Sequence, residues 1–443
     1  MKANIKPILL WLSLFISNTT LVGRDSPYTR KGTGPKYWIA YEYCIDNDKA
    51  IPEERWKNNI DWVVTNLKSF GYDMICNDGW IEAAQSVNSN GYITKYNSKW
   101  EHGFYYWGQY LKDNGMKMGV YYNPLWLTRT AYQENLEIIG AKVRTRDITG
   151  YSPFNSELYW VDVDKPGAKE WIQGYVNYFK SIGVSYLRID FLENYENNYG
   201  SRRYAQALKW IEEAAGDDLF LSLVMPNCFN HGETELKYGD MIRVSDDCWG
   251  GDWNFVSNKL RGEQKGKWPQ FSNVFDGMIG FADIGAHGQM ILDGDFMRMN
   301  KLASDDERKF LFSLMIMGGS ALAIADQFDT GESYKWVYQN AELNELNAQR
   351  FIAKPLSYDY RDTINSSRWA GRLLNGDWIV GLFNRESTIQ SRSIDFEKEL
   401  GLKKNETYVV RDLWKQQNIE VMSGNYSTQL KPHECRIIKI RTK

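Results

Sequence analysis

Short apolar runs and longer amphipathic segments alternate along most of the chain. The apolar runs predict eight strands, at 37–41, 72–76, 116–122, 185–190, 219–224, 241–245, 290–292 and 321–325. Between them, apolar residues spaced three and four positions apart predict helices over 55–70, 104–114, 167–182, 203–215 and 307–317. Alternating strands and helices form parallel sheets, and eight strands make a (β/α)8 TIM barrel. We therefore predict an α/β fold with a TIM barrel over residues 36–350; an open, doubly wound sheet is the alternative.

Beyond Pro355 the pattern changes to short strands without helices between them. Apolar runs at 378–383, 408–414 and 435–440 are separated by turn-forming residues, and Asn375-Gly376 is a hairpin signal. About 85 residues of this kind are enough for a small sandwich. The sequence therefore predicts a C-terminal antiparallel β-sandwich domain over residues 356–443.

The first residues have the pattern of a signal peptide. Lys2 and Lys6 precede an apolar run at 8–16, and a polar stretch with small residues follows it. The run is too short to span a bilayer, and no later run approaches about 18 consecutive apolar residues. We predict a signal peptide over residues 1–23, no membrane span, and a secreted or periplasmic protein; a membrane-anchoring N-terminus is the alternative.

Charge and composition narrow the class of ligand. In 443 residues, 53 Lys and Arg oppose 56 Asp and Glu, and the basic residues form no run, which argues against a nucleic-acid partner. Aromatic residues make up 15% of the chain, with 18 Trp and 28 Tyr. Such rings either fill an aromatic-rich core or stack on polyhydroxylated ligands, so a carbohydrate substrate becomes a candidate.

Motifs for metal and cofactor chemistry are missing from the sequence. The five cysteines form no CxxC pair, and the four histidines are scattered without metal-ligand spacing. No GxSxG elbow, P-loop or strand-linked GxGxxG is present either. We expect neither a metal nor a cofactor; the oligomeric state stays open.

Three predicted strands end in charged or amide side chains. Arg188 and Asp190 alternate with apolar residues and so share a face, and Arg243 is followed by Asp246-Asp247. Asn77-Asp78 ends a third strand. Carboxylates that converge from separate strands suit glycoside cleavage, which needs a nucleophile or base and an acid. Ordinary polar strand ends are the competing interpretation.

These residues resemble the motifs of clan D glycoside hydrolases, closest to the family 27 α-galactosidases (melibiases). The resemblance runs from about Pro35 to the C-terminus. Its motifs are the segments 71–80, 115–122, 189–190, 243–247 and, in the C-terminal sandwich, 410–414 with 430–433. It implies a retaining exo-glycoside hydrolase that releases terminal α-D-galactose by double displacement.

The resemblance also implies roles for individual residues. Asp190 would be the nucleophile and Asp246 the general acid/base. Asp247 is the reserve candidate, because the spacing from Arg243 is one residue tighter here than in the family's closest members. We expect the Asp190 carboxyl to lie closer to Asp246 than to Asp247. The implied substrate-binding residues are Trp38, Tyr41, Asn77, Asp78, Arg188, Asn227 and Arg243.

Several positions depart from the family pattern. Asn77 stands where the family has a first aspartate, Arg188 where it has lysine, and 225–227 replaces its recognition loop. The tryptophan-containing aspartate motif of the seventh strand is reduced to residues 286–290. These changes favour altered specificity, and a β-L-arabinopyranosidase or another clan D activity is the first alternative. A non-catalytic glycan-binding barrel is the second.

Overall fold

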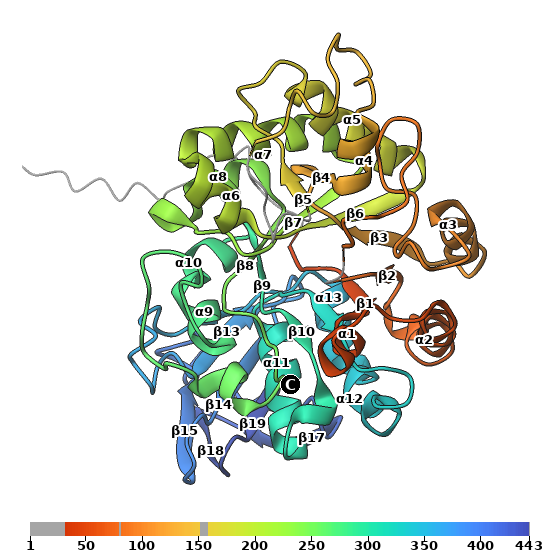
Figure 1. Cartoon of the computed structure of the whole chain (residues 1–443). Coiled ribbons are helices and arrows are strands. Elements are labelled where there is room, and N and C mark those ends of the chain that lie inside the picture. Colours follow the sequence, from red (N-terminus) through yellow and green to blue (C-terminus); the bar gives the residue numbers. More distant parts are fainter. Residues whose placement is uncertain (1–31, 79–80, 151–157, 443) are drawn as a thin grey trace, which may run out of the picture.

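The computed structural model describes residues 32–78, 81–150 and 158–442 (Figure 1). The predicted signal peptide lies outside the described residues. Among the helices in these three ranges, none has the length and apolar character needed to cross a membrane.

A parallel sheet closes into a TIM-like barrel, which confirms the predicted fold (Figure 1). Its strand order is β10-β11-β1-β2-β3-β6-β7-β8-β9, and all neighbours pair in parallel. The end strands β9 and β10 are separated along the chain only by Gly294 and Asp295, so they share one of eight barrel positions. The strands are β1 (Lys36–Ile39), β2 (Met74–Cys76), β3 (Lys117–Tyr121), β6 (Val184–Ile189), β7 (Phe220–Leu223), β8 (Met241–Arg243), β9 (Ile291–Asp293), β10 (Phe296–Met297) and β11 (Leu322–Ile324).

The five predicted helices are present in the structure. They are α2 (Glu53–Asn66), α3 (Phe104–Asp113), α5 (Ala168–Ser181), α7 (Ser201–Ala215) and α11 (Asp305–Met317). Helix α11 begins where Ser304 accepts a hydrogen bond from the Glu307 backbone N–H at 3.2 Å, a side-chain cap. Helices not predicted are α1 (Tyr41–Asn47), α4 (Arg129–Glu134), α6 (Leu192–Tyr199), α8 (Phe229–Tyr238), α9 (Val274–Gly280), α10 (Ala282–Gly285), α12 (Lys335–Tyr338) and α13 (Ala341–Ala348).

The C-terminal part is an antiparallel sandwich, as the sequence predicts. One sheet has the order β12-β13-β14-β19-β16-β17, and a second sheet consists of β15 and β18. Strands β4 (Trp126–Thr128) and β5 (Leu158–Trp160), which come earlier in the chain, form a separate two-stranded sheet. Side chains of both sheets share one apolar core that includes Val380, Ile394 and Tyr426. The strands are β12 (Lys354–Pro355), β13 (Arg368–Arg372), β14 (Trp378–Phe383), β15 (Gln390–Asp395), β16 (Tyr408–Asp412), β17 (Gln417–Met422), β18 (Asn425–Leu430) and β19 (Cys435–Thr442).

Strand β14 is buried on both faces because it lies between the sandwich interior and the barrel. Val380 and Leu382 point into the sandwich core, whereas Ile379 and Phe383 belong to the main core of the barrel. This period-two division is the normal consequence of strand geometry. Helix α11 packs against β14 and β19, so the two domains share apolar surface.

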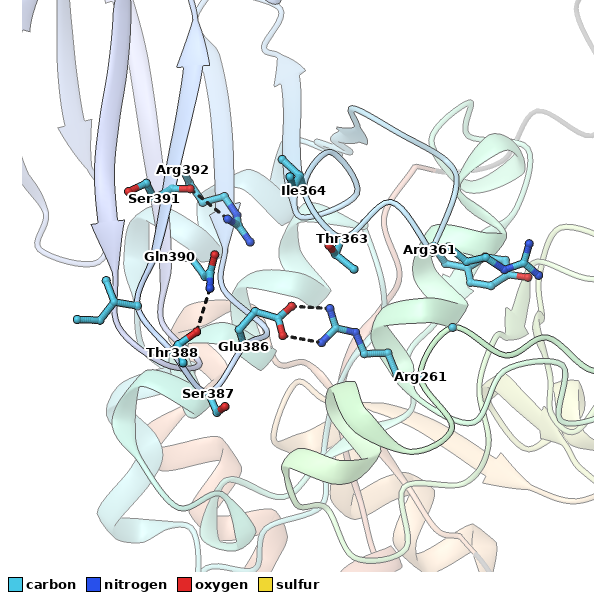
Figure 2. Close-up of a pocket in the computed structure, with 13 residues that line it drawn as sticks. Arg261, Arg361, Thr363, Ile364, Glu386, Ser387, Thr388, Gln390, Ser391 and Arg392 are labelled. Carbon is cyan, nitrogen blue, oxygen red and sulfur yellow. Dashed lines mark hydrogen bonds and ion pairs between the residues drawn. The ribbon is translucent and has the colours of Figure 1, made fainter.

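Polar contacts also connect the sandwich to the barrel segment that follows β8. Arg385 and Asp276 form an ion pair at 2.7 Å with both side chains fully buried, and Arg385 also donates to Ser257 Oγ at 2.8 Å. Nearby, Arg261 and Glu386 form an ion pair in the wall of a cavity of about 1,090 Å³ (Figure 2). The segment between β8 and α9 is therefore held by the C-terminal domain.

Candidate functional site

A cavity of about 340 Å³ opens at the carboxyl ends of the barrel strands. This is the end at which TIM barrels carry their active sites. Its volume is near the lower end of the roughly 300–1,000 Å³ typical of small-ligand sites. The lining residues follow or end six barrel strands: Tyr41, Cys44, Ile45, Asp48, Asp78, Tyr121, Asp190, Phe191, Met225, Asp247 and Trp249.

Asp190 follows β6 and is held at both carboxylate oxygens. The Tyr121 hydroxyl donates to Oδ2 at 2.8 Å, and the Phe191 backbone N–H donates to Oδ1 at 2.7 Å. Asn123 fixes the backbone by donating to the Asp190 carbonyl at 2.8 Å. These contacts restrict the carboxylate to one orientation at the wall of the cavity.

The pKa of Asp190 is raised to about 6, chiefly by burial and then by the nearby charge of Asp247. Arg188 and the two hydrogen bonds from Phe191 and Tyr121 oppose this rise. The carboxyl is therefore mostly ionised at neutral pH, as a nucleophile must be, and becomes protonated below about pH 6.

Asp247, rather than Asp246, lines the cavity together with Asp190. The Arg243 guanidinium donates to Asp247 Oδ1 at 2.7 Å. The Asp246 carboxylate instead accepts from Lys259 Nζ at 2.7 Å, and its other oxygen accepts from the Asp247 backbone N–H. The cavity therefore contains the reserve candidate Asp247, whereas the Asp246 carboxylate faces Lys259.

Two aspartates that sequence reasoning missed lie buried beside the arginines of the site. Asp293 ends β9 and Asp295 follows it, and both side chains are fully buried. The sequence interpretation put the reduced seventh-strand motif at 286–290, whereas the strand occupies 291–293, with Asp293 as its last residue and Asp295 two residues later. The signal was present: Asp293-Gly294-Asp295 directly follows the apolar run at 290–292.

Buried arginines connect these aspartates to those of the cavity. Arg188 pairs with Asp78 at 3.2 Å, Asp293 at 3.1 Å and Asp295 at 3.4 Å. Arg243 pairs with Asp295 at 2.8 Å as well as with Asp247. Asp295 therefore links Arg188, which pairs with Asp78, to Arg243, which pairs with Asp247.

Burial is the main cause of the raised pKa values of Asp78 and Asp295 in this network, and neighbouring aspartates add to it. Burial raises the pKa of Asp78 to about 8; Arg188 opposes the rise and neighbouring aspartates add to it. Burial likewise raises the pKa of Asp295 to about 7, against the opposing charges of Arg243 and Arg188. Asp78 is therefore largely neutral at pH 7 and can donate as well as accept a hydrogen bond.

The structure brings only some of the predicted substrate-binding residues to the cavity. Asp78 and Tyr41 line it, and Arg188 and Arg243 lie buried behind its carboxylates. The remaining three make other contacts: Asn77 accepts from the Tyr121 backbone N–H, Trp38 donates to the Asp326 carbonyl, and Asn227 donates to Glu196. Their side chains are used to position neighbouring segments.

An aromatic wall stands at the mouth of the cavity. Tyr41 packs on Phe296 with ring centroids 4.0 Å apart, and its ring lies 6.1 Å from that of Trp249 at 64°. Trp249 is 51% exposed although its neighbours in the wall are buried. The sequence reasoning did not single it out, because it lies in an irregular segment after β8.

Three residues at or beside the cavity adopt left-handed backbone conformations without being glycine. Phe191 has φ 59°, Met225 φ 53° and Asp295 φ 72°. Such conformations cost roughly 1–3 kcal/mol and cluster at functional sites, where the surrounding structure imposes them.

Within the described residues, no group of three or more His, Cys, Asp or Glu side chains is arranged to hold a metal ion.

Comparison with known proteins places this arrangement in a family. Residues 365–440 match the alpha galactosidase C-terminal beta sandwich domain. The isomalto-dextranase of Arthrobacter globiformis is 42% identical over 449 residues, which cover 95% of this chain and 69% of that protein.

Solved structures agree with this relationship. The isomalto-dextranase of A. globiformis T6, complexed with panose, superposes with a TM-score of 0.89 over 94% of this chain and 74% of that chain. A family 27 β-L-arabinopyranosidase from Geobacillus stearothermophilus shares the fold, with a TM-score of 0.74, 20% identity, and coverage of 93% and 97%. The chain belongs to the family 27-like glycoside hydrolases of clan D.

Proposed function

We propose that this protein is a retaining glycoside hydrolase in which Asp190 is the nucleophile and Asp247 the general acid/base. The observation that carries the proposal is the position of these two carboxylates in one cavity, at the ends of β6 and β8. A retaining mechanism needs such a pair on either side of the scissile bond. Asp246 suits the acid role less well, because it is not among the residues that line the cavity and its carboxylate faces Lys259 instead.

The reaction proceeds in two displacements. Asp190 attacks the anomeric carbon and forms an ester bond while the glycosidic C–O bond breaks, and the leaving oxygen takes the proton of Asp247. Asp247 then removes a proton from water, whose oxygen attacks the same carbon and releases the sugar from Asp190. The anomeric configuration is retained because the carbon is inverted twice.

The surrounding groups support each step. Tyr121 and the Phe191 N–H hold the Asp190 carboxylate in place, which reduces the entropy lost when the bond forms. Arg243 orients Asp247 by a charge-assisted hydrogen bond. Asp78 lines the same cavity and can form a hydrogen bond to a sugar hydroxyl there.

For the substrate we propose an α-linked glucan of the dextran class. The support is the 42% identity to an isomalto-dextranase over 95% of this chain. Release of α-galactose, which the family resemblance implies, has weaker support because Asn77 is committed to the β3 backbone. Galactosides and β-L-arabinopyranosides are therefore the comparison substrates.

Hydrolysis of dextran, isomaltotriose, melibiose and 4-nitrophenyl β-L-arabinopyranoside, followed by NMR of the first-formed anomer, tests the proposal. We expect turnover of the α-1,6-glucans with retention. Exclusive turnover of melibiose or the arabinopyranoside would overturn the substrate class, and an inverted product would overturn the mechanism. Failure to label Asp190 with a mechanism-based inactivator, together with inertness to all four, would instead favour the glycan-binding barrel.

A further inference from the structure

We propose that Trp249 is the platform for the sugar ring on the leaving-group side and that Arg298 is the positioning residue that holds it there. The inference rests on the proposed function, since it takes Asp247 as the acid/base. It assigns a leaving-group-side binding site and one residue outside the cavity that sets its shape.

The position of Trp249 relative to Asp247 is the first step. Trp249 follows Asp247 by two residues, and both line the cavity. The acid/base gives its proton to the oxygen that joins the two sugars, so the departing ring must lie beside Asp247. With 51% of its surface exposed at the cavity mouth, Trp249 has an aromatic face available for the C–H side of that ring.

Arg298 fixes the backbone that carries this indole. It follows β10, is 1% exposed, and donates from Nη1 to the Trp249 carbonyl at 2.7 Å. Gly251, with φ 67°, lets the same segment approach closely, because a Cβ there would lie 2.6 Å from Arg298 Cβ. A buried guanidinium thus holds the Trp249 segment against the barrel.

The other end of Arg298 reaches helix α1, which carries the Tyr41 part of the same aromatic wall. Its Nη2 donates to both carboxylate oxygens of Asp46, each at 2.7 Å. Asp46 lies on α1, the helix whose Tyr41, Cys44 and Ile45 line the cavity. One arginine therefore fixes the position of the Trp249 segment relative to the helix that carries Tyr41.

Lys301 provides a matched control for this contact. It also pairs with Asp46, at 3.2 Å, but it has no contact with Trp249 among those described. Its side chain is 36% exposed, and such pairs contribute little to stability. Lys301→Met therefore removes a cation from Asp46 without releasing the Trp249 segment.

The test compares leaving groups that do and do not contain a ring. Isomaltose and α-glucosyl fluoride share a glycone, as do melibiose and α-galactosyl fluoride, and fluoride cannot use a leaving-group-side platform. For Trp249→Ala we expect kcat/KM to fall about tenfold on the disaccharide that the wild type cleaves and less than about twofold on its fluoride. Arg298→Met and Asp46→Asn should show the same selectivity more weakly, mainly in KM, and Lys301→Met should show none.

The outcomes separate this inference from the proposed function. If the wild type cleaved only melibiose and α-galactosyl fluoride, the glucan substrate would be contradicted. The ratio of kcat/KM on melibiose to kcat/KM on the fluoride would still test the role of Trp249. Equal losses on disaccharide and fluoride for Trp249→Ala would overturn the platform. Selective loss for Trp249→Ala without any loss for Arg298→Met and Asp46→Asn would overturn the positioning role of Arg298. Asp46→Asn keeps the test interpretable if Arg298→Met does not fold, because Asp46 is partly exposed.

Discussion

At the scale of single residues, adjacent Asp246 and Asp247 differ in environment. Asp247→Ala should lower kcat/KM on α-linked disaccharides by about 10²–10⁴, the usual contribution of general acid/base catalysis. Asp246→Ala should change it by less than about tenfold, because its pair with Lys259 is partly exposed. Steady-state kinetics of both variants, with the glycosyl fluoride as a substrate that needs no acid, provide the measurement. A larger loss for Asp246→Ala would reverse the assignment.

Tyr121 offers a second test at this scale, through pH dependence. Its hydroxyl hydrogen bond lowers the pKa of Asp190, so Tyr121→Phe should raise that pKa above its value of about 6. The acidic limb of kcat/KM against pH should move upward, and kcat should fall about tenfold because a hydrogen bond to a charged group is lost.

Tyr122→Phe is the matched control for this change. The neighbouring hydroxyl donates to the Trp126 carbonyl, at 3.2 Å, and not to Asp190. Its pH profile should overlay that of the wild type. If Tyr121→Phe also left the acidic limb unmoved, Tyr121 would have no part in setting the ionisation of the nucleophile.

At the scale of elements, the segment between β8 and α9 depends on Arg385 of the sandwich. Arg385→Met should lower the free energy of unfolding by about 3–5 kcal/mol, since it leaves the fully buried Asp276 carboxylate without its cation. Arg261→Gln removes the partly exposed pair with Glu386 (Figure 2) and should cost no more than about 1 kcal/mol. Urea unfolding at 25 °C measures both, and equal small losses would show that the buried pair does not hold the domains together.

At the scale of the whole molecule, the excess of buried carboxylates makes stability pH-dependent. A carboxyl whose pKa rises on folding, such as Asp78 at about 8, binds its proton more tightly in the folded state. Its contribution to stability is complete below the unfolded pKa of about 3.9 and is lost as the pH rises through about 8.

Asp78→Asn removes this titration while keeping the shape of the side chain. The melting temperature of the wild type should therefore fall more steeply between pH 5 and pH 8.5 than that of the variant, as followed by scanning calorimetry. Asp246→Asn, a change at a partly exposed ion pair, should keep the slope of the wild type. Parallel slopes for wild type and Asp78→Asn would mean that Asp78 is ionised throughout this range.

Sequence patterns identified the elements of this protein better than the directions of its side chains. The eight apolar runs correspond to the eight barrel positions, and Asp190, Asp78 and Tyr41 reach the predicted cavity. Period and spacing are local properties, because they arise from which face of a strand or helix is buried. Trp38 and Asn227 are fully buried and do not line the cavity, because a side chain near a strand end can point either toward the cavity or into the protein interior.

The sequence by itself determined the barrel, the sandwich and the convergence of carboxylates at one end of the strands, since hydrophobic periodicity and strand direction suffice for these. Only the tertiary structure decided which of Asp246 and Asp247 lines the cavity with Asp190, how Asp295 joins the two arginines, and that Arg298 reaches Trp249. These contacts join irregular segments far apart in the chain. Their geometry depends on long-range packing and buried charge, which no local spacing encodes.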